Sequence, residues 1–237
     1  MSRATRRALL ALVAGAFLTA GMAASAECRA EAANDVAAAE SCAIAGADYP
    51  VVRVQATLAG SAAAVAALYR DPATCPLSQV ECVGERVFPA GAAHRTLLHR
   101  VSGHGFARRV TLANAAWWRL PGGGAVLDLV GADDAENPYG GTRVLCLRER
   151  ITLTPAPGGR VQIVHQAVRD PQPPFGLGAA VVTPRTVEIM LETLANLAEF
   201  LQRPAYRNPP PLDDLPVLAA PLPDLGAGFA RCQAARR

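Results

Sequence analysis

The sequence predicts an α+β fold in which a strongly curved antiparallel sheet wraps around one long helix near the C-terminus. Six strand patterns follow one another between residues 80 and 170, with only short turns between them, which favours an antiparallel meander. The strongest helical periodicity of the chain comes afterwards, at 187–202. A single strand pattern and a short helix pattern precede the series, at 49–71. This order of elements predicts a sheet that closes against its last helix.

The first 26 residues have the three parts of a signal peptide. A basic start, "MSRATRR", leads into the apolar run "ALLALVAGAFLTAGMA", and "ASA" is a small-residue cleavage site. A membrane anchor is less favoured because the apolar run is short and the cleavage motif follows at once. A lipoprotein is also disfavoured, since Glu27 rather than a small residue precedes Cys28. We therefore expect a periplasmic or secreted protein.

Cleavage changes the charge of the chain. The full sequence holds 23 basic and 20 acidic residues. Removal of Arg3, Arg6 and Arg7 with the signal peptide leaves 20 basic residues, so the mature chain is neutral. A nucleic-acid partner would require a net or clustered positive field. The composition therefore gives no reason to expect binding of nucleic acid.

Six cysteines remain after cleavage, and an even number in an exported chain predicts disulfides. Fifteen connectivities are open. The local pairs are Cys28–Cys42 and Cys75–Cys82, which would leave Cys146 with Cys232 and tie the C-terminal tail to a strand. A zinc site is the alternative, but the sequence has no CxxC pair and its histidines lie elsewhere.

The mature chain starts with an Ala- and acid-rich stretch, 27–47, for which we expect a short helix or a loose arm. The structured body, 48–203, opens with a half-buried strand in which Val52, Val54 and Ala56 alternate with polar residues. A helix follows, with Ser61 as its cap and Asp71-Pro72 as its end. The strand series then covers 80–88, 94–101, 105–120, 124–132, 141–155 and 159–170.

The last helix has one apolar face. Seven residues fall at helical spacing: Val187, Met190, Leu191, Leu194, Leu197, Ala198 and Leu201. Polar residues take the other face, so this helix should lie on an apolar surface. The tail, 204–237, holds seven prolines between 204 and 224, and we expect it to be surface-hugging or mobile.

A curved sheet closed by a helix leaves a cavity if side chains cannot fill the space between them. Such apolar cavities are ligand sites by default. The breaker-rich segment "DPQPPFGLG" before the helix would let the helix move as a lid.

Three stretches in order resemble the START lipid-transfer domains (the steroidogenic acute regulatory protein-related family) of the helix-grip superfamily. They are "YPVVRVQATLAGSAAAVAALYRD", "GTRVLCLRERITLTPAPGGRVQIVHQAVRDPQPPFG" and "VVTPRTVEIMLETLANLAEFL". The resemblance covers about 48–203. It implies a helix-grip fold and an apolar ligand such as a sterol, a phospholipid or another small molecule, with lipid transfer and transient membrane contact as further implications.

Apolar candidates for the cavity wall come from the last helix and from one strand. Met190, Leu194 and Leu197 would line the cavity, unless they belong to an ordinary packed core. Trp117 and Trp118 are adjacent on a strand and therefore point to opposite faces. One of them, named here as Trp117, should face the cavity or the core.

Polar candidates come from the strand series. Arg143 lies where members of the resembling family often place an arginine in the pocket, and Asp128 on the preceding strand is a plausible partner. A buried charge must be paired, and such a pair in an apolar cavity would hold the polar head of a ligand. A solvated strand face is the alternative for both. Arg148, Glu149 and Arg150 are expected to form cross-strand pairs on the surface.

An enzyme is the alternative function, because helix-grip relatives include cyclases and hydrolytic types. A general acid or base would come from His165, Asp128 or Glu149, with Arg143 stabilising an anion. The sequence contains no GxSxG, HExxH or paired-carboxylate motif, so we assign no catalytic residue. We also expect no cofactor and no metal. Docking of the Pro-rich tail to another protein is a third possibility.

Overall fold

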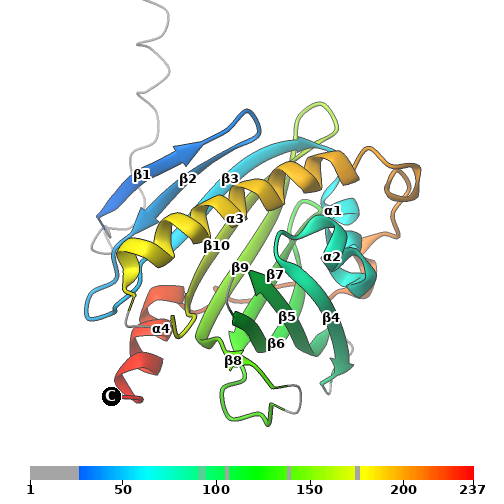
Figure 1. Cartoon of the computed structure of the whole chain (residues 1–237). Coiled ribbons are helices and arrows are strands. Elements are labelled where there is room, and N and C mark those ends of the chain that lie inside the picture. The colour runs from blue at the N-terminus through cyan, green and yellow to red at the C-terminus, as the bar shows by residue number, and fades with distance from the viewer. Residues whose placement is uncertain (1–26, 91, 93, 105–106, 138–139, 174–176) are drawn as a thin grey trace, which may run out of the picture.

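The computed structural model describes residues 27–90, 92, 94–104, 107–137, 140–173 and 177–237 (Figure 1). The signal peptide expected at 1–26 lies outside these residues. The strands are β1 (Cys28–Ala33), β2 (Ala37–Cys42), β3 (Val51–Ala59), β4 (Cys82–Pro89), β5 (Arg95–His104), β6 (Ala107–Leu120), β7 (Gly124–Gly131), β8 (Thr142–Arg143), β9 (Leu145–Ala156) and β10 (Arg160–Asp170). The α-helices are α1 (Ala62–Arg70), α2 (Cys75–Ser78), α3 (Ala179–Phe200) and α4 (Leu225–Ala234).

The described strands form one sheet in the order β1-β2-β3-β10-β9-β7-β6-β5-β4, with the short β8 beside β6. Neighbours in this order pair antiparallel. The predicted meander is therefore confirmed from β4 to β10, and β3 pairs with the last strand of the meander. The sheet curves strongly, and α3 lies across its inner face (Figure 1). This is the predicted α+β architecture.

Helix α3 buries the face that its periodicity predicts. Val187, Met190, Leu191, Leu194 and Leu197 are all less than 9% exposed and belong to the main hydrophobic cluster. Inward-facing residues of the central strands complete this cluster, and α1 contributes to it as well. Burial of a large aliphatic side chain stabilises a fold by about 1.5–3 kcal/mol. The α3–sheet contact is therefore a main source of stability.

Helix α1 follows its sequence signals closely. The Ser61 hydroxyl accepts a hydrogen bond from the Ala64 N–H at 3.1 Å, which satisfies a backbone donor at the helix start. The helix ends at Arg70, just before Asp71 and Pro72. Strand β3 before it buries Val52, Val54 and Ala56 on one face, as the alternation predicts.

The expectation of a helix or loose arm over 27–47 is wrong. This stretch forms the hairpin β1–β2, and β2 adds to the sheet beside β3. The Asn34 side chain accepts hydrogen bonds from the N–H groups of Val36 and Ala37 and so shapes the turn. Ala37 and Ala39 face the core. Alanine favours helices intrinsically, but that preference is weak, and pairing with β3 overrides it.

The tail follows the body of the protein rather than leaving it. Strand β6 exchanges backbone hydrogen bonds with the tail at Arg119, through Pro216 and Leu218. Helix α4 then packs on the outer face of the sheet, where Phe229 is fully buried beside Val51 and other residues of a second cluster. The tail therefore lies on the body of the protein and is partly packed into it, since Leu212 and Leu215 belong to the main hydrophobic cluster.

The three predicted disulfides are formed: Cys28–Cys42, Cys75–Cys82 and Cys146–Cys232. The first links the start of β1 to the end of β2, the second joins α2 to β4, and the third joins α4 to β9. Three disulfides among the described residues fit an oxidising compartment, such as the periplasm or the extracellular space.

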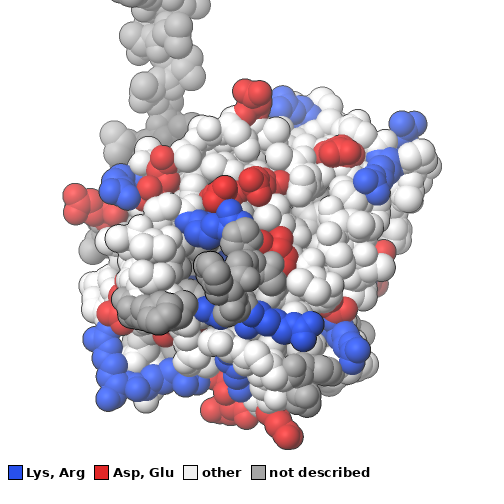
Figure 2. All heavy atoms as spheres, in the orientation of Figure 1, with Lys and Arg blue, Asp and Glu red and all other residues white. Residues whose placement is uncertain are grey.

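Acidic and basic side chains lie side by side over the upper part of the face shown in Figure 2.

None of the helices described here is both long and apolar enough to cross a membrane.

Candidate ligand site

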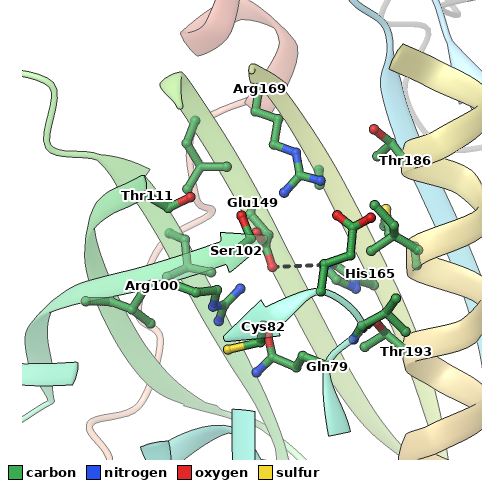
Figure 3. A pocket seen from close by; sticks show the side chains of 18 residues that line it. Gln79, Cys82, Arg100, Ser102, Thr111, Glu149, His165, Arg169, Thr186 and Thr193 are labelled. Carbon is green, nitrogen blue, oxygen red and sulfur yellow. Dashed lines mark hydrogen bonds and ion pairs between the residues drawn. The ribbon is translucent and has the colours of Figure 1, made fainter. Parts of the chain in front are cut away.

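A cavity of about 70 Å³ lies between the inner face of the sheet and α3 (Figure 3). Strands β5, β6, β7, β9 and β10 supply one side of its wall, and Thr186, Met190 and Thr193 of α3 supply the other. The segment Gln79–Cys82, between α2 and β4, closes the wall next to α3. We call this segment the latch. The cavity therefore lies where a helix-grip fold encloses its interior.

The centre of the cavity holds a buried acid–base pair. His165 on β10 is opposite Ile151 on β9, so Glu149 is its diagonal neighbour on the same face of the sheet. His165 Nε2 and Glu149 Oε1 are 2.9 Å apart, and both residues are less than 8% exposed. Burial opposes ionisation of Glu149. The hydrogen bond from His165 and the charges of His165, Arg100 and Arg169 outweigh it, and they lower the Glu149 pKa to about 2.

A second charged pair involves Arg100, which lines the cavity from β5. Arg100 on β5 is directly opposite Glu85 on β4, and Arg100 Nε donates to Glu85 Oε2 at 2.8 Å. The Glu85 side chain is only 1% exposed. The Arg100 guanidinium reaches toward Glu149 from one side, while Arg169 of β10 reaches toward it from the other (Figure 3). The interior is therefore charged at its centre, as the expected Arg143–Asp128 pair would also have made it, but the charges come from other residues.

Two polar atoms beside this cluster have no hydrogen-bond partner among the described residues. They are the Tyr69 hydroxyl of α1 and Nδ1 of His165, and both are buried. Burial, with the charge of Glu149 adding to it, raises the Tyr69 pKa far above its ordinary value. Tyr69 therefore stays protonated and can donate a hydrogen bond. Buried groups of this kind are normally satisfied, so they mark places where a ligand or water can bind.

The latch is attached to α3 by two polar contacts. The Val80 N–H donates to Thr193 Oγ1 at 3.2 Å, and Arg185 donates from two nitrogens to Glu81 Oε1, the Nε contact being 3.0 Å. Glu81 has a φ of 64°, in the left-handed region that is uncommon for residues other than glycine. The Cys75–Cys82 disulfide holds the other end of the latch.

The predicted apolar site residues divide into two groups. Met190 lines the cavity. Leu194, Leu197 and Trp117 are buried in the main hydrophobic cluster and do not line this cavity. Trp118 lies on the opposite side of β6, near the outward-facing Asp128. Most of the space between sheet and helix is thus filled by side chains, and the cavity is what remains.

The proposed pairing of Arg143 with Asp128 is not formed, and neither residue lines the cavity. Asp128 faces outward from β7, because Leu127 and Leu129 take the inward positions, and it pairs with Arg150 at 2.8 Å. Arg143 donates to the carbonyl oxygens of Ala132 and Ala135, both at 2.6 Å, and so fixes the loop after β7. Of the acid–base candidates, the structure brings together only His165 and Glu149.

The expectation that Glu149 forms a surface pair is wrong, and the sequence held the signal that corrects it. Leu147, Glu149 and Ile151 occupy alternate positions on β9, and all three are buried. The neighbouring arginines, 148 and 150, point to the other face. A carboxylate at an inward position of an apolar alternation is a buried carboxylate. The same alternation on β10 places His165 and Arg169 inside.

No protein-family model and no curated protein matches this sequence. Solved structures do match. The STAR-related lipid transfer protein of Xanthomonas axonopodis is 14% identical with a TM-score of 0.65, over 74% of this chain and 99% of that fragment. The human StarD13 lipid transfer and protein localization domain is 13% identical with a TM-score of 0.64, over 74% and 89% of the two chains.

Human StAR-related lipid transfer protein 5 gives a similar result. It is 11% identical with a TM-score of 0.64, over 83% of this chain and 91% of that one. TM-scores of 0.64–0.65 show a shared fold, whereas identities of 11–14% leave the ligand open. This chain has the START-like helix-grip fold.

Proposed function

We propose that this chain is an exported START-like protein that binds one lipid or similar small molecule between its sheet and α3, and transfers it between membranes. The observation that carries the proposal is the cavity between the sheet and α3, with a polar cluster inside it and α3 and the latch as parts of its wall. The structural neighbours are lipid transfer proteins, which supports the same function.

Binding of a whole lipid requires the cavity to grow. Ligand pockets usually measure about 300–1,000 Å³, whereas this cavity measures about 70 Å³. Glu81–Arg185 and Val80–Thr193 are polar contacts between the latch and α3 in the described part of the chain. Their separation would open a path to the interior. We therefore expect ligand uptake to proceed by movement of the latch away from α3.

Transfer also requires contact with a membrane. Leu77 of α2, Val83 at the start of β4 and Val181 in the first turn of α3 are each more than half exposed. These elements adjoin the latch, because α2 and β4 flank it and Arg185 follows Val181 by one helical turn. Exposed apolar side chains around a pocket opening are suited to transient insertion into a bilayer surface.

Export is supported by the three disulfides and by the signal-peptide pattern at 1–26. A carrier is useful in an aqueous compartment such as the periplasm, because an apolar molecule must be shielded from water there.

Native mass spectrometry with lipid extraction tests the proposal, using mature protein purified from an exporting host without detergent. We expect a stoichiometric added mass that extracts as one lipid class. Ala167→Leu, which adds bulk to the cavity wall, should reduce this occupancy. Gln166→Leu, the adjacent residue on the opposite face of β10, should not. A protein that arrives empty and binds no added sterol or phospholipid would overturn the proposal.

A second candidate function, catalysis, is favoured by the buried Glu149–His165 pair. Glu149 holds one ring nitrogen of His165, which leaves Nδ1 available for proton transfer. Conversion of the bound molecule to one of different mass, lost in His165→Ala while binding persists, would establish an enzyme. Unchanged mass over long incubation would leave the carrier as the sole function.

A further inference from the structure

Arg169 is the one cationic side chain of the cavity wall that lacks a partner in the described part of the chain. It lies near the end of β10, and its side chain extends into the cavity toward Glu149 (Figure 3). No hydrogen bond or ion pair joins its guanidinium to any described residue. The Arg169 side chain is partly buried; desolvation lowers its pKa, and the negative charge of Glu149 opposes this shift.

The carboxylates near Arg169 are already engaged by other residues. Glu149 and Glu81 are the acidic groups whose charges act on it. Glu149 is bound by His165 at 2.9 Å, and Glu81 is bound by Arg185. Other arginines of the sheet are satisfied by protein contacts, since Arg100 holds Glu85, Arg150 holds Asp128 and Arg143 holds two backbone carbonyls. Arg169 instead presents its donors to the cavity.

These donors define the chemistry that would complete the site. A guanidinium offers five N–H groups in a planar fork that matches two oxygens of a carboxylate or a phosphate. Arg100 uses only Nε toward Glu85, so further donors of that residue also face the same space. The cavity, at about 70 Å³, holds only a few waters by volume, which suits a head group rather than a whole lipid.

We infer that the ligand is an amphiphile with a singly charged anionic head group, a carboxylate or a phosphodiester, and that Arg169 binds this head group from the end of β10. The inference rests on the proposed ligand-binding function and adds the chemical class of the ligand. The head group occupies the present cavity, and the apolar tail extends toward the latch, where the interior must open.

Binding of a fluorescent fatty acid and of its neutral ester tests the inference. The probes are cis-parinaric acid and its methyl ester, titrated into the mature, oxidised protein. We expect the wild-type protein to bind the acid about tenfold to a hundredfold more tightly than the ester, as for a charge-assisted hydrogen bond. Arg169→Gln should lose this preference while keeping the ester affinity, and Arg169→Lys should keep part of it.

Arg160→Gln is the matched control, because Arg160 is an exposed arginine on the same strand and lies outside the cavity. It should leave both affinities unchanged. Displacement of bound cis-parinaric acid by lysophosphatidylglycerol would extend the site to phosphodiesters, and absence of displacement would assign it to carboxylates.

Equal wild-type affinities for acid and ester, with no effect of Arg169→Gln, would overturn the head-group inference and leave ligand binding intact. Failure of the wild-type protein to bind either probe would instead count against the proposed function, and the inference would fall with it. Because the acid–ester preference is measured on the wild-type protein, the test does not depend on the folding of any variant.

Discussion

Replacement of Glu149 by Gln should change how the stability of the protein depends on pH. The Glu149 pKa is about 2 in the folded protein and 4.5 ordinarily, a difference equivalent to about 3 kcal/mol. Because the folded-state pKa is the lower one, this stabilisation is fully present above pH 4.5. It is lost as the pH falls through the folded value, and about 2 kcal/mol should be gone by pH 3.

Urea denaturation at pH 7, 5, 4 and 3, followed by circular dichroism with the disulfides intact, measures this effect. The free energy of unfolding of Glu149→Gln should be lower at pH 7 and should fall less steeply than the wild-type value between pH 5 and pH 3. Glu192→Gln, on the exposed face of α3, is the control and should follow the wild-type curve. Parallel curves for wild type and Glu149→Gln would refute a strongly lowered pKa at Glu149.

Three other perturbations have expected outcomes. Phe229→Ala removes a fully buried ring of α4 and should lower the free energy of unfolding by about 3–5 kcal/mol. Val217→Ala, at an exposed position of the tail, should lower it by less than about 0.5 kcal/mol. Replacing Cys146 and Cys232 together by Ser opens a loop with a sequence separation of 86 residues, which should cost about 4 kcal/mol in urea denaturation. Glu81→Gln weakens the latch, so stopped-flow fluorescence should show release of cis-parinaric acid accelerated by roughly tenfold; an unchanged rate would exclude the latch as the gate.

The elements that the sequence predicts well are those whose pattern is local. The six strands of the meander and the face of α3 that packs on the sheet follow from periodicity alone, and Ser61 and Asp71 bound α1 as their side chains suggest. The stretch 27–47 departs from its expectation because its conformation depends on a distant partner. Its alanines carry no strong pattern of their own, and pairing with β3 decides the outcome.

The residues of the cavity wall are harder to predict, because the curvature of the sheet decides which strands lie close together. Arg100 and Glu149 are separated by β6 and β7 in the sheet, yet their charges interact across the cavity. No spacing along the chain reports that proximity. The resemblance to the START family predicts Arg143 in the pocket, with Asp128 as its partner. The alternation on β7 instead places Asp128 on the outer face.

Strand alternation still identifies which charges belong to the interior once the sheet is known to close. Arg100, Glu149, His165 and Arg169 all occupy inward positions on their strands. Taking a charge out of water costs several kcal/mol unless a partner compensates it, and three of these residues have one. Arg169 has no hydrogen bond to a described residue, so only the nearby charges of Glu149 and Glu81 offset the cost of its partial burial. A ligand with an anionic head group would remove that cost, and the same interaction would make the charged ligand bind better than its neutral analogue.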